Sequence, residues 1–257
     1  MSLSATFGLI LICFHALAIE TNGYHIQEHA AYATSIKGFI ESLKPIIRSG
    51  NESLGIPPLD PFLAEELPIE VDLEDVVKVK LDLFDVDVRG LSEFDVNKGE
   101  FEMLSMKLVI DLTWPLVYAT ANYNINGTLG GEMPIFGKGD ITAGVKGFNF
   151  FTEISFKLKN LKYVEVKNII LKIALGGLDF KITGLFNDEE LSELVSSMIS
   201  EMVPDLIKEN HDEIVGYIIP ILKDKINEIL EGKTISDIIK IIGGYSQENQ
   251  IKLINGV

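Results

Sequence analysis

Apolar residues between Leu191 and Leu230 recur every three or four positions, which is the spacing of one face of an α-helix. A polar break at 210–212 interrupts this stripe before it resumes. The piece from 205 to 231 alone would be about 40 Å long as a helix, more than the width of a small compact domain. So long and apolar a helix needs an elongated wrapper, which favours a container over a catalyst.

The sequence also predicts where this helix begins, where it ends and where it is interrupted. Asn187, with Glu190 three residues later, predicts the N-terminal cap, and Gly232 predicts the C-terminal stop. Pro204 and Pro220 lie inside the pattern, and we expect them to divide or kink the helix because proline lacks the N–H that an inner turn needs.

Between Val71 and Thr183 the apolar period changes to two, which predicts β-strands. Apolar residues from Val77 to Leu83 alternate with charged ones, and the parity shifts at 83–84, where we expect a bulge or bend. A strand from Leu104 to Trp114 is expected to stop, or to lie at a sheet edge, at Pro115. Further strands are expected at 117–124, 139–151, 153–161, 163–171 and 177–183.

The segment ahead of the strands predicts a helix followed by an extended connection. Tyr24 to Arg48 has helical spacing, and the three prolines of 55–62 exclude both a helix and a central strand. No low-complexity linker or charge run divides the chain. We therefore expect one elongated α+β domain, in which a strongly curved antiparallel sheet wraps around a long C-terminal helix.

The first 18 residues have the features of a secretory signal peptide. Phe7 to Ala18 is an apolar run that ends in the small-x-small sequence Ala16-Leu17-Ala18. A membrane anchor is the alternative, but a run of about 12 residues is too short to span a bilayer. We expect a leader at 1–18, a ligand-binding domain at 19–257, and a secreted, extracellular protein with no stable membrane insertion.

Charge and cysteine usage narrow the function classes. The formal net charge of the 257-residue chain is −16, which repels nucleic acid and anionic lipid headgroups and keeps a lipophilic carrier in solution. Cys13, inside the leader, is the only cysteine, so the mature chain would have neither a disulfide nor a thiol nucleophile. Asn51 and Asn126 begin acceptor triplets for N-glycosylation, which fits export.

Three stretches in order resemble the takeout and juvenile-hormone-binding-protein family of insects. They are the proline-rich 55–62, the hairpin segment 130–140 with Met133-Pro134-Ile135-Phe136-Gly137-Lys138-Gly139, and 185–187 followed by the long helix with Pro220. Together they cover nearly the whole chain after the leader. The family usually has two cysteines near the mature N-terminus that form a disulfide, and this chain has none between Glu20 and Phe62.

The resemblance implies a long helix rolled inside a curved sheet, with an apolar tunnel for a terpenoid, a fatty-acid derivative or a similar molecule. Tunnel-lining candidates are apolar residues on inward faces, since methionine and aromatic side chains suit an adaptable pocket. They are Leu81, Phe84, Leu108, Trp114, Tyr118, Met133, Phe136, Phe150, Met198, Met202, Ile214 and Ile218. Ordinary core packing is the alternative for each. Polar groups that would orient a ligand are Tyr118, Thr120, Tyr123 and Tyr217.

Catalysis has little support in the sequence. His25 and His29, with Glu28 between them, match the inverted zinc-protease string, but they lie close to the cleavage site on an expected exposed helix turn. His211 lies in the polar break of the long helix. Gly137-Lys138-Gly139 lacks the rest of a phosphate loop, and a hairpin turn accounts for it. We expect no enzyme activity, no cofactor and no metal.

Four functions remain open, in this order. The first is a secreted carrier of a small hydrophobic ligand. The second is a defence protein that binds lipid or membrane surfaces through a basic amphipathic face; the net charge argues against it, and only a local patch of Lys157, Lys159, Lys162 and Lys167 would supply the positive charge. The third is a protein-interaction module with a filled core. The fourth is a metallohydrolase that uses His25 and His29.

Overall fold

The computed structural model of this chain describes residues 34–51, 56–73, 77–130 and 132–240. The expected leader and the first ten residues of the expected first helix lie outside these residues. The elements, in chain order, are β1 (Thr34–Ser35), α2 (Lys37–Ser49), β2 (Phe62–Leu73), β3 (Val77–Arg89), β4 (Asp95–Glu102), β5 (Lys107–Leu129), β6 (Met133–Lys159), β7 (Tyr163–Ala174), β8 (Gly177–Ile182), α3 (Glu189–Glu209) and α4 (His211–Leu230).

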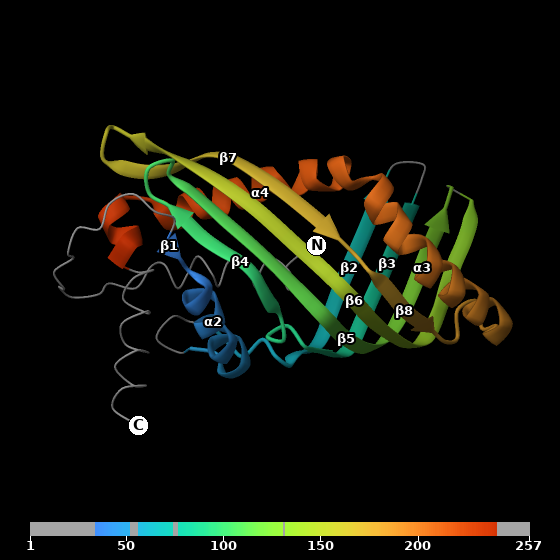
Figure 1. The fold of residues 1–257 in the computed structure, drawn as a ribbon. Coiled ribbons are helices and arrows are strands. Elements are labelled where there is room, and N and C mark those ends of the chain that lie inside the picture. Colours follow the sequence, from blue (N-terminus) through green and yellow to red (C-terminus); the bar gives the residue numbers. More distant parts are fainter. Residues whose placement is uncertain (1–33, 52–55, 74–76, 131, 241–257) are drawn as a thin grey trace, which may run out of the picture.

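All eight strands form one antiparallel sheet that does not close into a barrel, with the C-terminal helices packed along it (Figure 1). This arrangement confirms the expected α+β class. Strands β5 and β6, of 23 and 27 residues, pair along the whole of β5 and form a hairpin on the order of 70 Å long. One half of the hairpin is flanked by β4 and β7, and the other half by β3 and β8.

The parity of the buried residues changes along the long hairpin. In the half beside β4, the even-numbered residues of β5 from Leu108 to Trp114 join the main core, which α2 and α4 complete. In the half beside β3, odd-numbered residues take that role, since Tyr123 and Ile125 belong to a second core with Ile182 and Leu185. Val117, just beyond Pro115, still packs against the main core, so the core stays on the same side of the sheet across the change of parity.

Pro115 marks the point where the parity of the buried residues changes, and here the expected end of the strand is wrong. Strand β5 continues through it. Pro115 falls between the pairing with β4, which ends at Thr113, and the pairing with β3, which begins at Tyr118. On the other side it stands opposite Gly147, whose φ is +58°. The strand survives because no neighbour in the sheet requires an N–H at this residue.

The expected bulge in β3 is confirmed. The register of β3 against β5 shifts between Phe84 and Asp87, and Asp85 has a φ of +49°. Strand β2 was not expected from 62 onward, because its sequence has no alternating pattern at the start and contains Pro68. Proline is tolerated there because β2 is the last strand at its edge of the sheet.

The long helix is two helices, α3 and α4, which meet at Asn210. The polar break therefore divides it, whereas Pro204 and Pro220 both lie inside helical segments. The expected cap at Asn187 is wrong by one residue, since the side chain of Asp188 accepts a hydrogen bond from the backbone N–H of Leu191 at 3.0 Å. The expected stop agrees with the structure: α4 ends at Leu230, two residues before Gly232.

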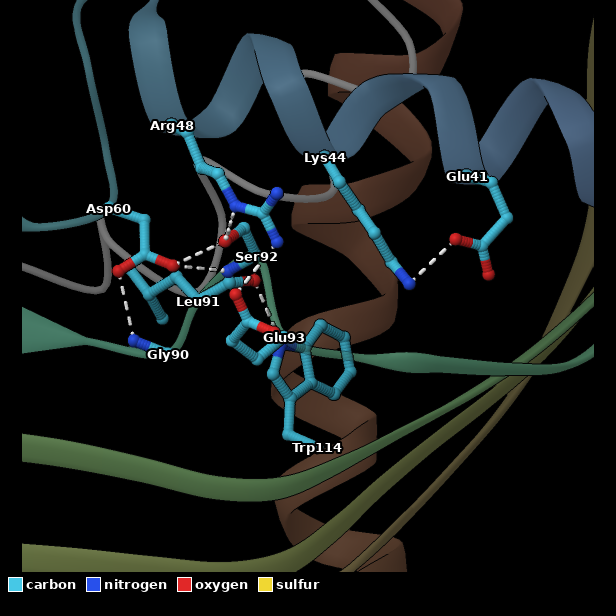
Figure 2. A network of polar contacts seen from close by, with 9 residues as sticks. All are labelled: Glu41, Lys44, Arg48, Asp60, Gly90, Leu91, Ser92, Glu93 and Trp114. Atoms are coloured by element: carbon cyan, nitrogen blue, oxygen red, sulfur yellow. Dashed lines mark hydrogen bonds and ion pairs between the residues drawn. The ribbon is translucent and has the colours of Figure 1, made fainter.

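A polar network fastens α2 to the turn between β3 and β4 (Figure 2). One carboxylate oxygen of Asp60 accepts the Gly90 N–H at 2.9 Å, and the other accepts the N–H and the hydroxyl of Ser92 at 2.8 and 2.5 Å. From α2, Arg48 donates through Nε to the Ser92 hydroxyl at 3.0 Å and pairs with Glu93 at 2.7 Å. Ser92 is fully buried, so its polar atoms depend on these partners.

Substitution of Asp60 by asparagine should lower the free energy of unfolding by about 2 kcal/mol, because one acceptor oxygen becomes an amide donor facing donors in a buried turn. Urea denaturation of the two proteins measures the difference. Asp87→Asn is the control, because Asp87 pairs with Arg89 at an exposed site and its loss should change stability little. Equal effects of the two substitutions would contradict the structural role of the network.

Candidate functional site

A broad surface of partly buried apolar residues lies on the second half of the sheet. Pairing aligns Leu83 with Tyr123 and Ile141 with Ile182, so that β2, β3, β5, β6 and β8 contribute to one face. The apolar residues on it around the second core are only partly buried. They are Leu67, Ile69, Val79, Leu81, Leu83, Val117, Ala119, Ala121, Ile125, Ile135, Ile141, Ala143, Val145, Leu178 and Phe180. We call these residues the apolar face.

None of the residues of the apolar face carries a charge. The opposite face of the same strands is polar, with Asn122, Asn124 and Asn126 exposed along β5 and Lys78 and Lys80 exposed on β3. Because uncharged and charged residues are separated onto the two faces, an ionised group placed on the apolar face would find no ionic partner there.

Tyr123 is the polar group buried at the centre of the second core. Its hydroxyl donates to the backbone carbonyl of Thr183 at 2.8 Å. Burial raises the pKa of Tyr123, and the nearby carboxylate of Glu189 raises it further, so the hydroxyl stays neutral. The hydrogen bond of Tyr123 therefore holds the connection after β8 in place, and its hydroxyl proton is already donated to the Thr183 carbonyl.

Helix α3 lies along the outer edge of β8 and is attached by serine hydroxyls. Ser192, Ser196 and Ser200 accept the backbone N–H groups of Leu185, Ile182 and Phe180 at 3.0, 3.0 and 2.9 Å. Each hydroxyl also donates to a carbonyl four residues earlier in α3, at 2.6–2.8 Å. The helix thus satisfies an edge strand whose N–H groups would otherwise be open to another chain.

A stripe of exposed apolar side chains runs beside the serines on α3. Val195 packs against the second core, and at about 100° per residue the stripe lies next to that contact, on the side away from the serines. Its members are Leu191, Leu194, Met198, Met202 and Leu206. We call them the α3 stripe. The buried residues of α3 are Ser192 and Ser196, so its apolar side chains contribute to the surface rather than to a filled core.

The expected lining residues do not form one cluster. Four of them lie in or against the main core: Leu108, Trp114, Phe150 and Ile218. Three belong to the surfaces defined above: Leu81 to the apolar face, and Met198 and Met202 to the α3 stripe. These three come from elements that meet at the second core.

The other five expected residues lie elsewhere. Phe84 and Tyr118 pair with Asn122 and Arg89, on the face opposite to the apolar face. Ile214 is half-buried on α4. Met133 and Phe136 are exposed near the start of β6, where the ring of Phe136 meets that of Phe186 edge-on at 5.5 Å.

Sequence reasoning missed the small residues of the apolar face and the role of the serines. Ala119, Ala121 and Ala143 carry too little hydrophobicity to be selected as lining residues. The spacing of Ser192, Ser196 and Ser200 was visible as every fourth residue of a predicted helix, and it was the signal that could have located the contact of α3 with a strand edge.

Side chains of helix α4 also accept hydrogen bonds from backbone N–H groups of β7, but α4 is packed into the core as well. Asn227 accepts the Val166 N–H at 2.8 Å, and Nε2 of His211 accepts the Ile173 N–H at 3.3 Å, which places the ring proton on Nδ1 beside Asp212. His211 is thereby a structural acceptor.

The described residues hold no group of three or more His, Cys, Asp or Glu that could bind a metal ion. His25 and His29 lie outside these residues. Within the described ranges, no helix is long and apolar enough to cross a membrane. Of the glycosylation candidates, Asn126 is exposed on the polar face of β5, and Asn51 forms an isolated bridge with Ile56.

Replacing Ser196 by alanine should lower the free energy of unfolding by about 1–2 kcal/mol, because the buried N–H of Ile182 loses its acceptor. Ser197→Ala is the matched control, since Ser197 is exposed on the same helix turn. Urea denaturation measures stability, and hydrogen exchange of the Ile182 amide reports the contact directly. An unchanged exchange rate in Ser196→Ala would contradict the attachment by serines.

Comparison with known proteins agrees with the expected family. The family model of haemolymph juvenile hormone binding protein (JHBP) matches residues 9–240, so the chain belongs to this family. A solved structure with a similar fold is Takeout 1 of Epiphyas postvittana, with a TM-score of 0.52 and 15% identity over 79% of this chain and 93% of that chain.

A lipopolysaccharide binding protein of known structure is more distant. Its TM-score is 0.32 and its identity is 11%, over 78% of this chain and 37% of that chain. A search of curated proteins gave no match.

Proposed function

We propose that this protein is a secreted carrier of a small, neutral, hydrophobic molecule, which it binds on the apolar face and the α3 stripe. The observation that carries the proposal is the partly exposed apolar face itself. An apolar surface of this extent usually marks a binding site in a soluble protein. Membership of the juvenile hormone binding family supports a hydrophobic ligand in general.

The chemistry of the site favours a ligand without an ionised group. The apolar face offers hydrocarbon from five strands, and the α3 stripe adds two methionines, whose flexible side chains adapt to ligands of different shape. A carboxylate placed there would lose its hydration without gaining a cationic partner. A neutral terpenoid or a fatty-acid ester fits this surface, and juvenile hormone itself is one possibility within that class.

Secretion and the absence of catalysis are part of the same proposal. The apolar run with its cleavage sequence at 16–18 supports export, and the exposed position of Asn126 is compatible with a glycan that leaves the apolar face uncovered. The polar network around Asp60 and Ser92 holds a turn, which is a structural role. These features support a carrier rather than an enzyme.

Leu83→Asp should weaken binding of the neutral fluorescent probe N-phenyl-1-naphthylamine by roughly tenfold or more, because a charge would stand in the middle of the apolar face. Fluorescence titration measures the dissociation constant. Asn124→Asp, which adds the same charge on the opposite face, is the matched control and should bind the probe as the unmodified protein does. Equal losses in both variants, or no uptake of the probe at all, would overturn the proposed site.

A second measurement tests the ligand class. Methyl palmitate should displace the probe at a concentration at least about tenfold lower than palmitate at neutral pH, since only the carboxylate must be desolvated without a partner. Native mass spectrometry of the protein from a secreting eukaryotic host, followed by organic extraction, would identify any molecule that copurifies. Tighter binding of palmitate than of its ester would contradict a neutral ligand.

A further inference from the structure

Two hairpin turns meet at one end of the sheet, far from the second core. The turn between β6 and β7 and the turn between β4 and β5 project together at this end (Figure 1). They are neighbours because Lys107, the first residue of β5, pairs with Ser155, and the Phe156 N–H donates to the carbonyl of Met106 at 2.8 Å. We call the two turns, 103–106 and 160–162, the tip.

The tip carries the two most exposed large apolar side chains of the described residues. Leu161 is 91% exposed in the turn between β6 and β7, and Leu104 is 84% exposed in the turn between β4 and β5. Such exposure means that neither leucine contributes to packing within the protein. The packing of the fold therefore does not require leucine at either position.

Backbone conformation makes Leu161 still less favourable. Asn160 and Leu161 have φ of +53° and +58°, and the Lys162 N–H donates to the Lys159 carbonyl at 3.2 Å, as in a type I′ turn. Asparagine suits the first central position of such a turn, whereas the second normally holds glycine. A leucine there adopts a left-handed conformation that its Cβ disfavours. Leu161 is thus unfavourable both in its exposure to solvent and in its backbone conformation, and positions of this kind cluster at functional sites.

The side of the tip formed by β6 and β7 has a local charge opposite to that of the molecule. Residues 157–167 contain four lysines and one glutamate, a net charge of 4 − 1 = +3, whereas the whole chain has −16. Lys157 lies 3.4 Å from Glu165, and the ammonium of Lys162 lies 5.0 Å from the centre of the Tyr163 ring. Lys159 and Lys162 directly flank the turn that presents Leu161, and both are exposed.

We propose that the tip docks this protein on an anionic lipid membrane surface, with Leu161 and Leu104 inserted among the lipid headgroups and the lysines in contact with lipid phosphates and carboxylates. Basic residues around protruding apolar side chains match both components of a membrane interface. The acidic remainder of the protein is repelled by the same surface, which orients the tip toward it.

The shape of the tip favours lipid over a protein partner. The two leucines stand on separate turns rather than on one flat patch, so a protein would need a matching pocket for each, whereas a fluid membrane adapts to both. The docking proposal rests on the proposed carrier function in one respect only. Docking by the tip would bring the apolar face of a carrier to a membrane that supplies or receives the ligand.

The full-length mature protein is tested by cosedimentation with vesicles of phosphatidylcholine alone and of phosphatidylcholine mixed with phosphatidylserine. We expect binding to the mixed vesicles that falls with added salt, and little binding to phosphatidylcholine alone. Leu161→Gly should weaken the binding by roughly fivefold or more, because it removes the inserted side chain. Its melting temperature should stay equal or rise, since glycine suits the positive φ.

A charge variant and a control complete the test. Lys159→Glu combined with Lys162→Glu should lower binding to mixed vesicles more than Leu161→Gly does. The binding that remains should no longer depend on salt. Leu63→Ser is the matched control, because Leu63 is 65% exposed on β2 in the other half of the sheet and should be dispensable.

The outcomes separate the docking proposal from the carrier proposal. Absence of binding to mixed vesicles, or unchanged binding of Leu161→Gly, would overturn docking. Loss of a dimer in Leu161→Gly, seen by sedimentation velocity without vesicles, would assign the tip to a second copy of the chain and would also overturn it. Uptake of N-phenyl-1-naphthylamine should be the same in all tip variants, so a protein that binds vesicles but no probe would refute the carrier function alone.

Discussion

The whole architecture depends on one constraint, the sharing of a single long hairpin by two half-sheets. Strands β5 and β6 keep one register along the whole of β5, yet the parity of their buried residues changes near Pro115. The flanking strands adapt to this change: β4 and β7 meet the hairpin where even residues of β5 are buried, and β3 and β8 meet it where odd residues are buried. The first half is filled by α2 and α4. The second half retains a broad apolar face that its helix covers only in part.

The two C-terminal helices are attached to this sheet by different kinds of interaction. Helix α4 buries Val215, Leu222, Ile226 and Leu230, so the hydrophobic effect holds it against β7. Helix α3 lies along β8 through three serine hydroxyls and leaves most of its apolar stripe at the surface. Each of these hydrogen bonds contributes about 0.5–1.5 kcal/mol net, because the same N–H groups bind water in the unfolded chain, whereas burial of one large aliphatic side chain contributes about 1.5–3 kcal/mol. The helix with the weaker attachment is also the one beside the apolar face.

Sequence patterns predicted those features that depend on one strand or one helix at a time. The parity shift at 83–84 located the bulge in β3, and the polar residues near 210 located the division between α3 and α4. The passage of β5 through Pro115 depends on which strands flank that residue, and one-dimensional patterns do not contain this information. The site was predictable in kind but only partly in detail. Leu81, Met198 and Met202 were identified because they are large, whereas Ala119 and Ala121 belong to the apolar face only through their register with β3 and β6.

Separation of charge follows from the same geometry and gives the molecule three distinct surfaces. Alternation along β3 and β5 places lysines and asparagines on one face and hydrocarbon on the other, so the strands that present the apolar face also keep it free of charge. Lys159 and Lys162 lie at the end of the sheet, because β6 and β7 continue past the turn between β4 and β5. An acidic body, a neutral apolar face and a basic tip with exposed leucines therefore occupy separate parts of one sheet. A carrier that must remain dissolved, hold an apolar ligand and approach a membrane needs these three properties at different places.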